Sequence, residues 1–425
     1  MEIIYSPIAL PGVTYDSTQK LEELLKKNHD FHIYFEGTKH NHIAHNLIAV
    51  YTLGASSEEL QAVFDKHDKI QKPLFPLKFD DPIHALGNPE TFVAHLGDET
   101  YYSDYLAFFD HEIKRNGVYA TFQTYYCGHG IASEQLRFQS LSGVLHGLIH
   151  VGYGIETGHP LLMSEGLALC AVERGDFDHT TAKFTDILFN RSIADDHGDT
   201  PSSSILDVFH ELYESKDILA PESKINPRHD KAFIGSADTS PIIEAICSKW
   251  KVKADAADIK DKLNELLSLS FHLYATTMHE YPAPHFDFFL MHTLTAGFFI
   301  PLVLSHIQSL ELQATMLKVC CRWFAVEYII AGVPEIHSHW LSQPIATPVS
   351  TSTFSWSDII QHANKDGDLH VAKVIRSLIK LDILHGKEEQ ENPFLKIAQM
   401  TIGFRKLQED DIKYAWLMTG VGYEK

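Results

Sequence analysis

The chain has 425 residues, of which 44% are hydrophobic and 21% charged, an ordinary balance for a globular protein. Its 35 basic and 56 acidic residues give a formal net charge of −21. This charge argues against nucleic acid and anionic membrane as partners, since both recruit basic patches. Five cysteines without a C-x-x-C pair, and an N-terminus without signal-peptide features, predict a cytoplasmic protein with reduced thiols.

Helical periodicity of the apolar residues dominates from one end of the chain to the other. It predicts helices over 17–28, 40–53, from Ser56 onward, and over 101–115, 133–151, 161–174, 255–277, 286–307, 310–331, 356–364, 368–384 and 393–400. Strand signals are confined to 3–5 and 32–35. The prolines of 72–92 predict a long connection with little regular structure. We therefore predict a mostly α fold, a single large multi-helix domain over 1–425 with little or no sheet.

Three further segments are marked by their composition. Residues 193–204 and 219–241 are polar and rich in turn residues, which predicts mobile surface segments. Residues 286–307 are apolar and long enough to span a bilayer. Because that stretch also holds Asp287 and His292, we interpret it as a buried central helix and not as a membrane span.

Four short apolar helical segments, spread over the whole chain, each contain at least one of the 27 histidines. The segments are 40–55, 145–156, 289–301 and 366–378. Burying an unpaired imidazole costs a few kcal/mol, and neutral imidazole is the commonest metal ligand in proteins. One such histidine is usually a satisfied core residue. At least one histidine in each of four such segments predicts one shared metal ion in a buried central site.

Two of these segments offer a choice of histidine. His42 and His45 share one predicted helix face, and His146 and His150 share another, so one of each pair can bind metal while the other supports it. A set of imidazoles suits Fe, Cu, Zn or Ni. An octahedral metal with five protein ligands keeps one position open for dioxygen.

The fourth segment carries a lysine one helical turn after its histidine. His370 and Lys373 are spaced i, i+3 and so lie on one face of a helix for which Asp368 is a candidate N-cap. Burial early in a helix disfavours an ammonium group and lowers the pKa of the lysine. A neutral lysine can react with carbon dioxide to give a carbamate, an anionic oxygen ligand. On spacing alone, an exposed lysine on an amphipathic helix is the simpler interpretation.

Other classes of protein leave weaker signals. His-Asp pairs at 29–30, 67–68 and 229–230 permit an all-helical metal-dependent hydrolase. A catalytically inactive helical binding protein is a third alternative. No G-x-G-x-x-G follows a predicted strand, so the sequence offers no nicotinamide or flavin site of the Rossmann type.

The four histidine motifs, in this order, resemble those of the questin oxidase-like family. The motifs are Asn41-His42 with Leu-Gly-Ala at 53–55, His146-Gly-Leu-Ile, Met291-His292-Thr and His370-x-x-Lys373, and they extend over nearly the whole chain. The resemblance implies one iron ion held by four histidines and a carboxylated lysine. Carried over motif by motif, the implied ligands are His42, His146, His292, His370 and Lys373.

The resemblance also implies an activity. Members of the family oxidise and open polyketide-derived anthraquinone rings with dioxygen, and some are described as NADPH-dependent. We therefore expect a mononuclear non-haem iron oxygenase, of the Baeyer-Villiger or the ring-cleaving type, acting on a small planar aromatic substrate. His45, His150 and Tyr153 are the candidate catalytic groups for proton transfer. The resemblance makes NADPH a candidate reductant, although the sequence has no motif for it.

Overall fold

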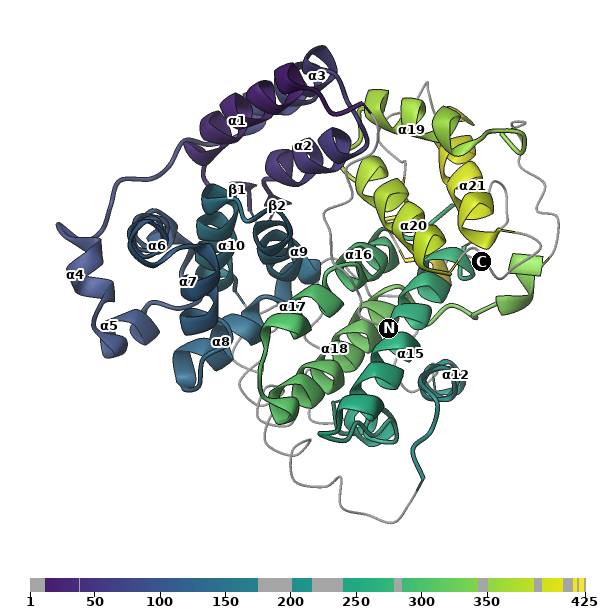
Figure 1. Ribbon diagram of the computed structural model, residues 1–425. Coiled ribbons are helices and arrows are strands. Elements are labelled where there is room, and N and C mark those ends of the chain that lie inside the picture. The colour runs from purple at the N-terminus through teal and green to yellow at the C-terminus, as the bar shows by residue number, and fades with distance from the viewer. Residues whose placement is uncertain are drawn as a thin grey trace. The chain divides into compact units, whose positions relative to one another are not determined.

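A computed structural model of the chain describes nine stretches, 12–37, 39–174, 201–215, 240–278, 285–342, 351–385, 392–407, 416–418 and 420–423. Helices make up most of the described residues, and the one sheet in them has two short strands (Figure 1). The predicted mostly α fold is therefore confirmed. Most of the two segments predicted to be mobile, 193–204 and 219–241, and the predicted strand at 3–5 lie outside the described residues.

The chain divides into two compact units, 1–174 with 349–403 and 175–348 with 404–425, so that the single domain over 1–425 stays a prediction. The elements of the first unit are α1 (Tyr15–His29), β1 (Tyr34–Glu36), β2 (Lys39–His40), α2 (Ile43–Thr52), α3 (Ser57–His67), α4 (Pro82–Leu86), α5 (Pro89–Ala94), α6 (Tyr102–Asn116), α7 (Val118–Tyr125), α8 (Ile131–Gln139), α9 (Ser142–Thr157), α10 (Pro160–Val172), α19 (Trp356–Lys365), α20 (Val371–His385) and most of α21 (Pro393–Leu407). Helix α10 packs against α9 and α6, and α2 packs against α9 and α20. Segments from both ends of the sequence thus meet around α2.

The helix predicted over 40–53 begins later than expected. Residues 39 and 40 pair with β1 instead, and α2 starts at Ile43 with His42 as its N-cap. The amide oxygen of Asn41 accepts the Ile43 N–H, so this side chain competes with a helical path for the backbone. His42 therefore lies at the N-terminus of α2 and not on one face of the helix.

The helix predicted over 133–151 is two helices, α8 and α9, and the backbone is left-handed within the first turn of α9. Gly143, Val144 and Leu145 have φ values of 58°, 60° and 65°. Left-handed backbone costs a β-branched residue such as Val144 on the order of 1–3 kcal/mol, so the surrounding packing must hold it. Part of that packing is at Gly147, where a Cβ atom would come 2.7 Å from the Ser140 Cα.

The connection predicted over 72–92 also contains regular structure. Two short helices, α4 and α5, begin at Pro82 and Pro89. The side chains of Asp81 and Asn88 cap them by accepting N–H groups of the first turn. Proline fits the first helical position, where its missing N–H is no loss, so here the prolines start helices instead of preventing them.

The second unit is also built from helices, α12 (Ile205–Glu214), α14 (Ser240–Cys247), α15 (Ala256–Ala275), α16 (Phe288–Gly297), α17 (Ile300–His306) and α18 (Leu310–Ile330). The helix predicted over 286–307 is interrupted after Gly297, and Pro301 lies in the first turn of α17. The segment Phe288–His306 has the length and hydropathy of a membrane span, and 89% of it is buried inside the protein. Helix α16 packs against α15 and α18, as a core helix of a globular unit does.

Candidate metal centre

His42 and His146 meet inside the first unit. Their Nε2 atoms lie 2.7 Å apart, and their ring planes are nearly perpendicular, at 87°. His42 occupies the N-cap position of α2, and His146 directly follows the left-handed residues 143–145 at the start of α9. Both side chains are buried.

The other ring nitrogen of each of these two histidines is held by a backbone carbonyl. His42 Nδ1 donates to the His40 carbonyl at 2.6 Å, and His146 Nδ1 donates to the Gly143 carbonyl. Because a carbonyl oxygen only accepts, each Nδ1 carries a proton, and a neutral ring then presents a lone pair at Nε2. Burial, together with the charge of Lys373, lowers the pKa of His42 well below its usual range.

Two lone pairs at 2.7 Å repel each other unless a proton or a cation lies between them. Two nitrogen ligands at neighbouring positions of one first-row metal ion, each at about 2.0–2.2 Å, are about 3 Å apart. The tautomers and the separation of His42 and His146 therefore fit a shared metal ion.

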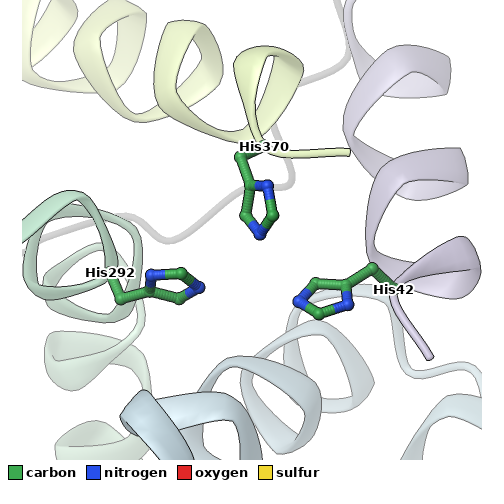
Figure 2. A group of neighbouring side chains, drawn as sticks. All are labelled: His42, His292 and His370. Carbon is green, nitrogen blue, oxygen red and sulfur yellow. The ribbon is translucent and has the colours of Figure 1, made fainter. Parts of the chain in front are cut away.

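His370 reaches the same region from the residue that precedes α20. Its Nδ1 lies 3.1 Å from the Asp368 carboxylate, which also accepts the His370 N–H at 2.7 Å. Its ring centroid is 4.9 Å from that of His42, and Figure 2 shows the two rings turned toward each other. A carboxylate on the far nitrogen of a histidine is the usual support for a metal ligand, because it fixes the tautomer and raises basicity. The predicted N-cap, Asp368, thus supports the ring, while the helix starts at Val371.

Lys373 is the third residue of α20 and is 2% exposed. Within the described part of the chain its Nζ has no hydrogen-bond partner. Burial lowers the pKa of Lys373 to about 7, against an opposing effect of Asp368. A buried amine with no acceptor is costly, so this arrangement is unusual for a purely structural residue. The alternative of an exposed surface lysine does not hold.

His292, the remaining predicted ligand, belongs to the second unit. It is fully buried on α16, and its Nδ1 donates to the Phe288 carbonyl at 2.8 Å. It therefore has the same protonation pattern as His42, with Nε2 as the nitrogen suited to a metal. The metal assignment of all five residues stays a prediction.

The three predicted proton-transfer residues form one buried cluster beside His42. The His45 ring stacks on Tyr153 at 5.5 Å and lies edge-on to His150 at 4.6 Å. Within the described residues neither nitrogen of His45 has a hydrogen-bond partner, and burial lowers its pKa well below the usual range. Burial also raises the pKa of the Tyr153 hydroxyl, so this group holds its proton and is a donor, not a base.

Several charged residues that the sequence analysis did not single out support these groups. Glu173 accepts from the Tyr34 hydroxyl at 2.9 Å and from His40 Nε2 at 2.7 Å, and the His40 ring stacks on His146 at 4.2 Å. Arg376 forms a buried ion pair with Glu156 at 2.6 Å, and its guanidinium lies 5.5 Å from the Tyr153 ring.

Glu165 is the third such carboxylate. It is 3% exposed and accepts from His29 at 2.8 Å and His150 at 3.2 Å. The available signal was a lone glutamate in the apolar run 160–172, since a buried charge needs partners. His29 lies between Glu165 and Asp110, so both of its ring nitrogens are occupied by carboxylates. This leaves it unsuited to the metal site of a His-Asp hydrolase.

Comparison with known proteins adds independent information. The sequence model of the family described as questin oxidase-like matches residues 39–378. A Baeyer-Villiger monooxygenase of Cryptosporiopsis sp. is 26% identical, over 87% of this chain and 82% of its own length. A Baeyer-Villiger oxidase of Pestalotiopsis fici is 27% identical, over 96% and 92%. A questin oxidase of Aspergillus fumigatus is 27% identical, over 94% and 91%.

Proposed function

The chain belongs to the questin oxidase-like family, and we propose that it is an iron-dependent oxygenase that inserts oxygen into, or cleaves, a ring of a polycyclic aromatic substrate of the anthraquinone type. The resemblance predicted from the four histidine motifs is confirmed by the match to the family. Its relatives are named as oxidases and monooxygenases, and the chain is accordingly an oxidoreductase. Iron, dioxygen and the anthraquinone type of substrate are parts of the proposal.

The proposed ligands are His42, His146, His292, His370 and a carboxylated Lys373. The observation that carries the proposal is the pair of Nε2 atoms of His42 and His146, 2.7 Å apart with both Nδ1 atoms donating to carbonyls. A donor set of neutral imidazoles with one anionic oxygen suits iron among other first-row metals. When bound there, ferrous iron would supply the one-electron chemistry by which dioxygen reacts with a closed-shell aromatic molecule.

Lys373 would contribute the anionic ligand. Its amine nitrogen adds to the carbon of carbon dioxide and loses one proton, which gives a carbamate with two oxygens. Three observations on Lys373 support the proposal: the side chain is buried, Nζ has no hydrogen-bond partner among the described residues, and the residue lies one helical turn after His370. A carbamate would replace a buried amine that has no acceptor among the described residues by a group whose charge a metal ion would balance.

The cluster beside the ligands would handle protons. The Tyr153 hydroxyl keeps its proton at neutral pH and is suited to donate a hydrogen bond to a substrate carbonyl or phenolate. His150 has one nitrogen on Glu165 and the other without a hydrogen-bond partner among the described residues, so it is suited to accept a proton. His45 lies between these two residues. NADPH dependence and a cytoplasmic location stay predictions.

The proposal is tested by anaerobic reconstitution. The full chain is loaded with ferrous iron, mixed with a panel of hydroxylated anthraquinones, and exposed to ¹⁸O-labelled dioxygen with and without NADPH. We expect about one iron per chain and a product that carries one or two labelled oxygens, which separates a monooxygenase from a dioxygenase. Equal turnover by the metal-free or zinc-loaded chain would contradict the proposal.

A further inference from the structure

A buried chain of polar contacts runs from the His150 ring to the surface of the first unit. His150 Nε2 lies 3.2 Å from Glu165 Oε2, Glu165 Oε1 lies 2.8 Å from His29 Nδ1, and His29 Nε2 lies 3.0 Å from Asp110 Oδ2. The side-chain exposures of these four residues are 1%, 4%, 15% and 40%. The series therefore connects a buried histidine of the cluster with solvent.

Close helix packing brings Glu165 to His150. Helices α9 and α10 approach each other through two glycines, Gly154 and Gly166. A Cβ atom at Gly154 would come 2.9 Å from the Met163 Cα, and one at Gly166 would come 2.9 Å from the Val151 nitrogen. Any larger residue would separate the helices and weaken the contact between the carboxylate and the ring.

The surroundings of Glu165 require that it is ionised. Burying an unpaired carboxylate costs several kcal/mol, and Glu165 is compensated by donors from His29, His150 and the Asn28 amide. Burial alone would raise the pKa of Glu165, but the hydrogen bonds from His150 and His29 outweigh this effect and hold it at about 2. The same contacts, with Asp110, outweigh burial of His29 and raise its pKa to about 10.

An ionised carboxylate can only accept hydrogen bonds, so the contact with Glu165 places the proton of His150 on Nε2. The lone pair of His150 is then on Nδ1, which has no hydrogen-bond partner among the described residues and belongs to the ring that lies against His45. A carboxylate in this position also stabilises the imidazolium that forms when the ring takes up a proton, as in the Ser-His-Asp triads.

We propose that Glu165 and His29 are positioning residues for proton transfer: they hold His150 in the Nε2-protonated tautomer, so that Nδ1 is the atom that accepts a proton from the substrate and returns it. His29 acts through Glu165, whose charge and orientation it fixes, and Asp110 ties His29 to the surface. The inference rests on the proposed function only in so far as a substrate gives up a proton in this cluster. The tautomer itself is independent of metal and substrate.

The test measures the tautomer directly. Two-bond ¹H–¹⁵N spectra of the full-length, iron-free chain with ¹⁵N-labelled histidine distinguish Nδ1–H from Nε2–H, and comparison with His150→Gln assigns the His150 signals. We expect the Nε2–H form in the parent chain. In Glu165→Gln the amide can donate to Nε2, so the Nδ1–H form should become predominant. Glu165→Asp should keep the Nε2–H form.

Turnover of the iron-loaded variants gives the second readout. Glu165→Gln should lower kcat by about 100-fold or more, with iron content and KM little changed. In His29→Gln the positive charge beside Glu165 is lost, so the ascending limb of kcat against pH should move to higher pH. The groups that face this network are Asn28 and His29 on α1, Tyr102 and Asp110 on α6, His45 on α2 and His150 on α9.

His159→Gln is the matched control. It removes another histidine–glutamate pair, with Glu22 at 3.3 Å, that lies outside this network, and it should change neither the tautomer nor the pH profile. An Nδ1–H tautomer of His150 in the parent chain would overturn the inference, as would an unchanged tautomer and kcat in Glu165→Gln. If Glu165→Gln does not fold, the tautomers of His150 in the parent chain and in Glu165→Asp still test the inference, because both should be Nε2–H. Failure to bind iron would contradict the proposed function and leave the tautomer result standing.

Discussion

His40 and His42 are separated by one residue, and both are buried, yet their Nε2 atoms meet opposite kinds of partner. His40 Nε2 lies 2.7 Å from the Glu173 carboxylate, which the Tyr34 hydroxyl also contacts. His42 Nε2 lies 2.7 Å from another Nε2, that of His146. The first contact is complete without any ligand, whereas the second needs a proton or a cation. Burial alone therefore does not identify a metal ligand. What distinguishes the two histidines is the chemical nature of the group that faces Nε2.

The largest effect is expected from substitution of His42. His42→Ala removes one of two facing donors, so the chain should lose most of its iron and at least about 1000-fold in turnover. His40→Gln removes a supporting contact of His146 and should lower iron affinity by only about 10–100-fold. Iron content after anaerobic reconstitution, together with kcat, measures both. Equal iron binding by His42→Ala and the parent chain would remove the distinction.

Lys373 extends the comparison from imidazoles to an amine. Lys373→Ala should lose activity and much of its iron, and Lys373→Glu, or added short-chain carboxylate, should restore part of both. Because the parent chain buries an amine without a hydrogen-bond partner among the described residues, iron-free Lys373→Met should be more stable, by roughly 1–4 kcal/mol in urea unfolding. Full turnover by Lys373→Ala with normal iron content would refute the carbamate.

His29, which contacts two carboxylates, should make the stability of the chain depend on pH. The pKa of His29 is raised to about 10 in the folded chain, against an ordinary value of 6.5. Its contribution is therefore fully present below pH 6.5 and is lost as pH rises through 10. We expect the free energy of unfolding to fall by up to a few kcal/mol across this window. His29→Gln should show a flatter curve, and parallel curves would contradict the pairing.

The smallest effect is expected at Asp287, a carboxylate that is satisfied by backbone N–H groups alone. It caps α16 by accepting from Phe289 and Leu290, and it also accepts from Val421. Burial raises its pKa from 3.8 to about 6, so its contribution to stability is present below pH 3.8 and lost as pH rises through 6. Asp287→Asn removes the charge and keeps the cap through Oδ1, but its amide nitrogen would face the Val421 N–H, so the two effects should leave the stability at pH 7 within about 1 kcal/mol of the parent chain. A loss equal to that of Asp287→Ala would show that the charge is required.

The helices and the four histidine motifs, as candidate metal ligands, could be predicted from the sequence. Both predictions depend on periodic patterns of apolar residues. The sequence did not predict the left-handed residues at 143–145 or the break after Gly297, since these depend on packing between distant segments. The N-cap position of His42 was missed for a related reason. It depends on the pairing of β1 with β2, which a helical pattern conceals.

The supporting carboxylates were harder to predict than the ligands. Glu165 and Glu173 are more than 120 positions away from His29 and His40 in sequence, and only the packed structure joins them. A glutamate in an apolar helix indicates that some partner exists, but not which one. The choice between His146 and His150 illustrates the difference. The structure gives His150 a carboxylate and His146 a facing imidazole, and spacing alone left the two equivalent.

The central claim is that facing imidazoles without a carboxylate between them mark a metal ion. Crystals of the full-length chain, reconstituted with ferrous iron without oxygen, permit one direct measurement: anomalous diffraction on both sides of the iron absorption edge. We expect a single anomalous peak within about 2.0–2.2 Å of the Nε2 atoms of His42, His146, His292 and His370, with density beyond the Nζ of Lys373. A peak at the His40–Glu173 pair, or none beside His42 in iron-loaded crystals, would contradict it.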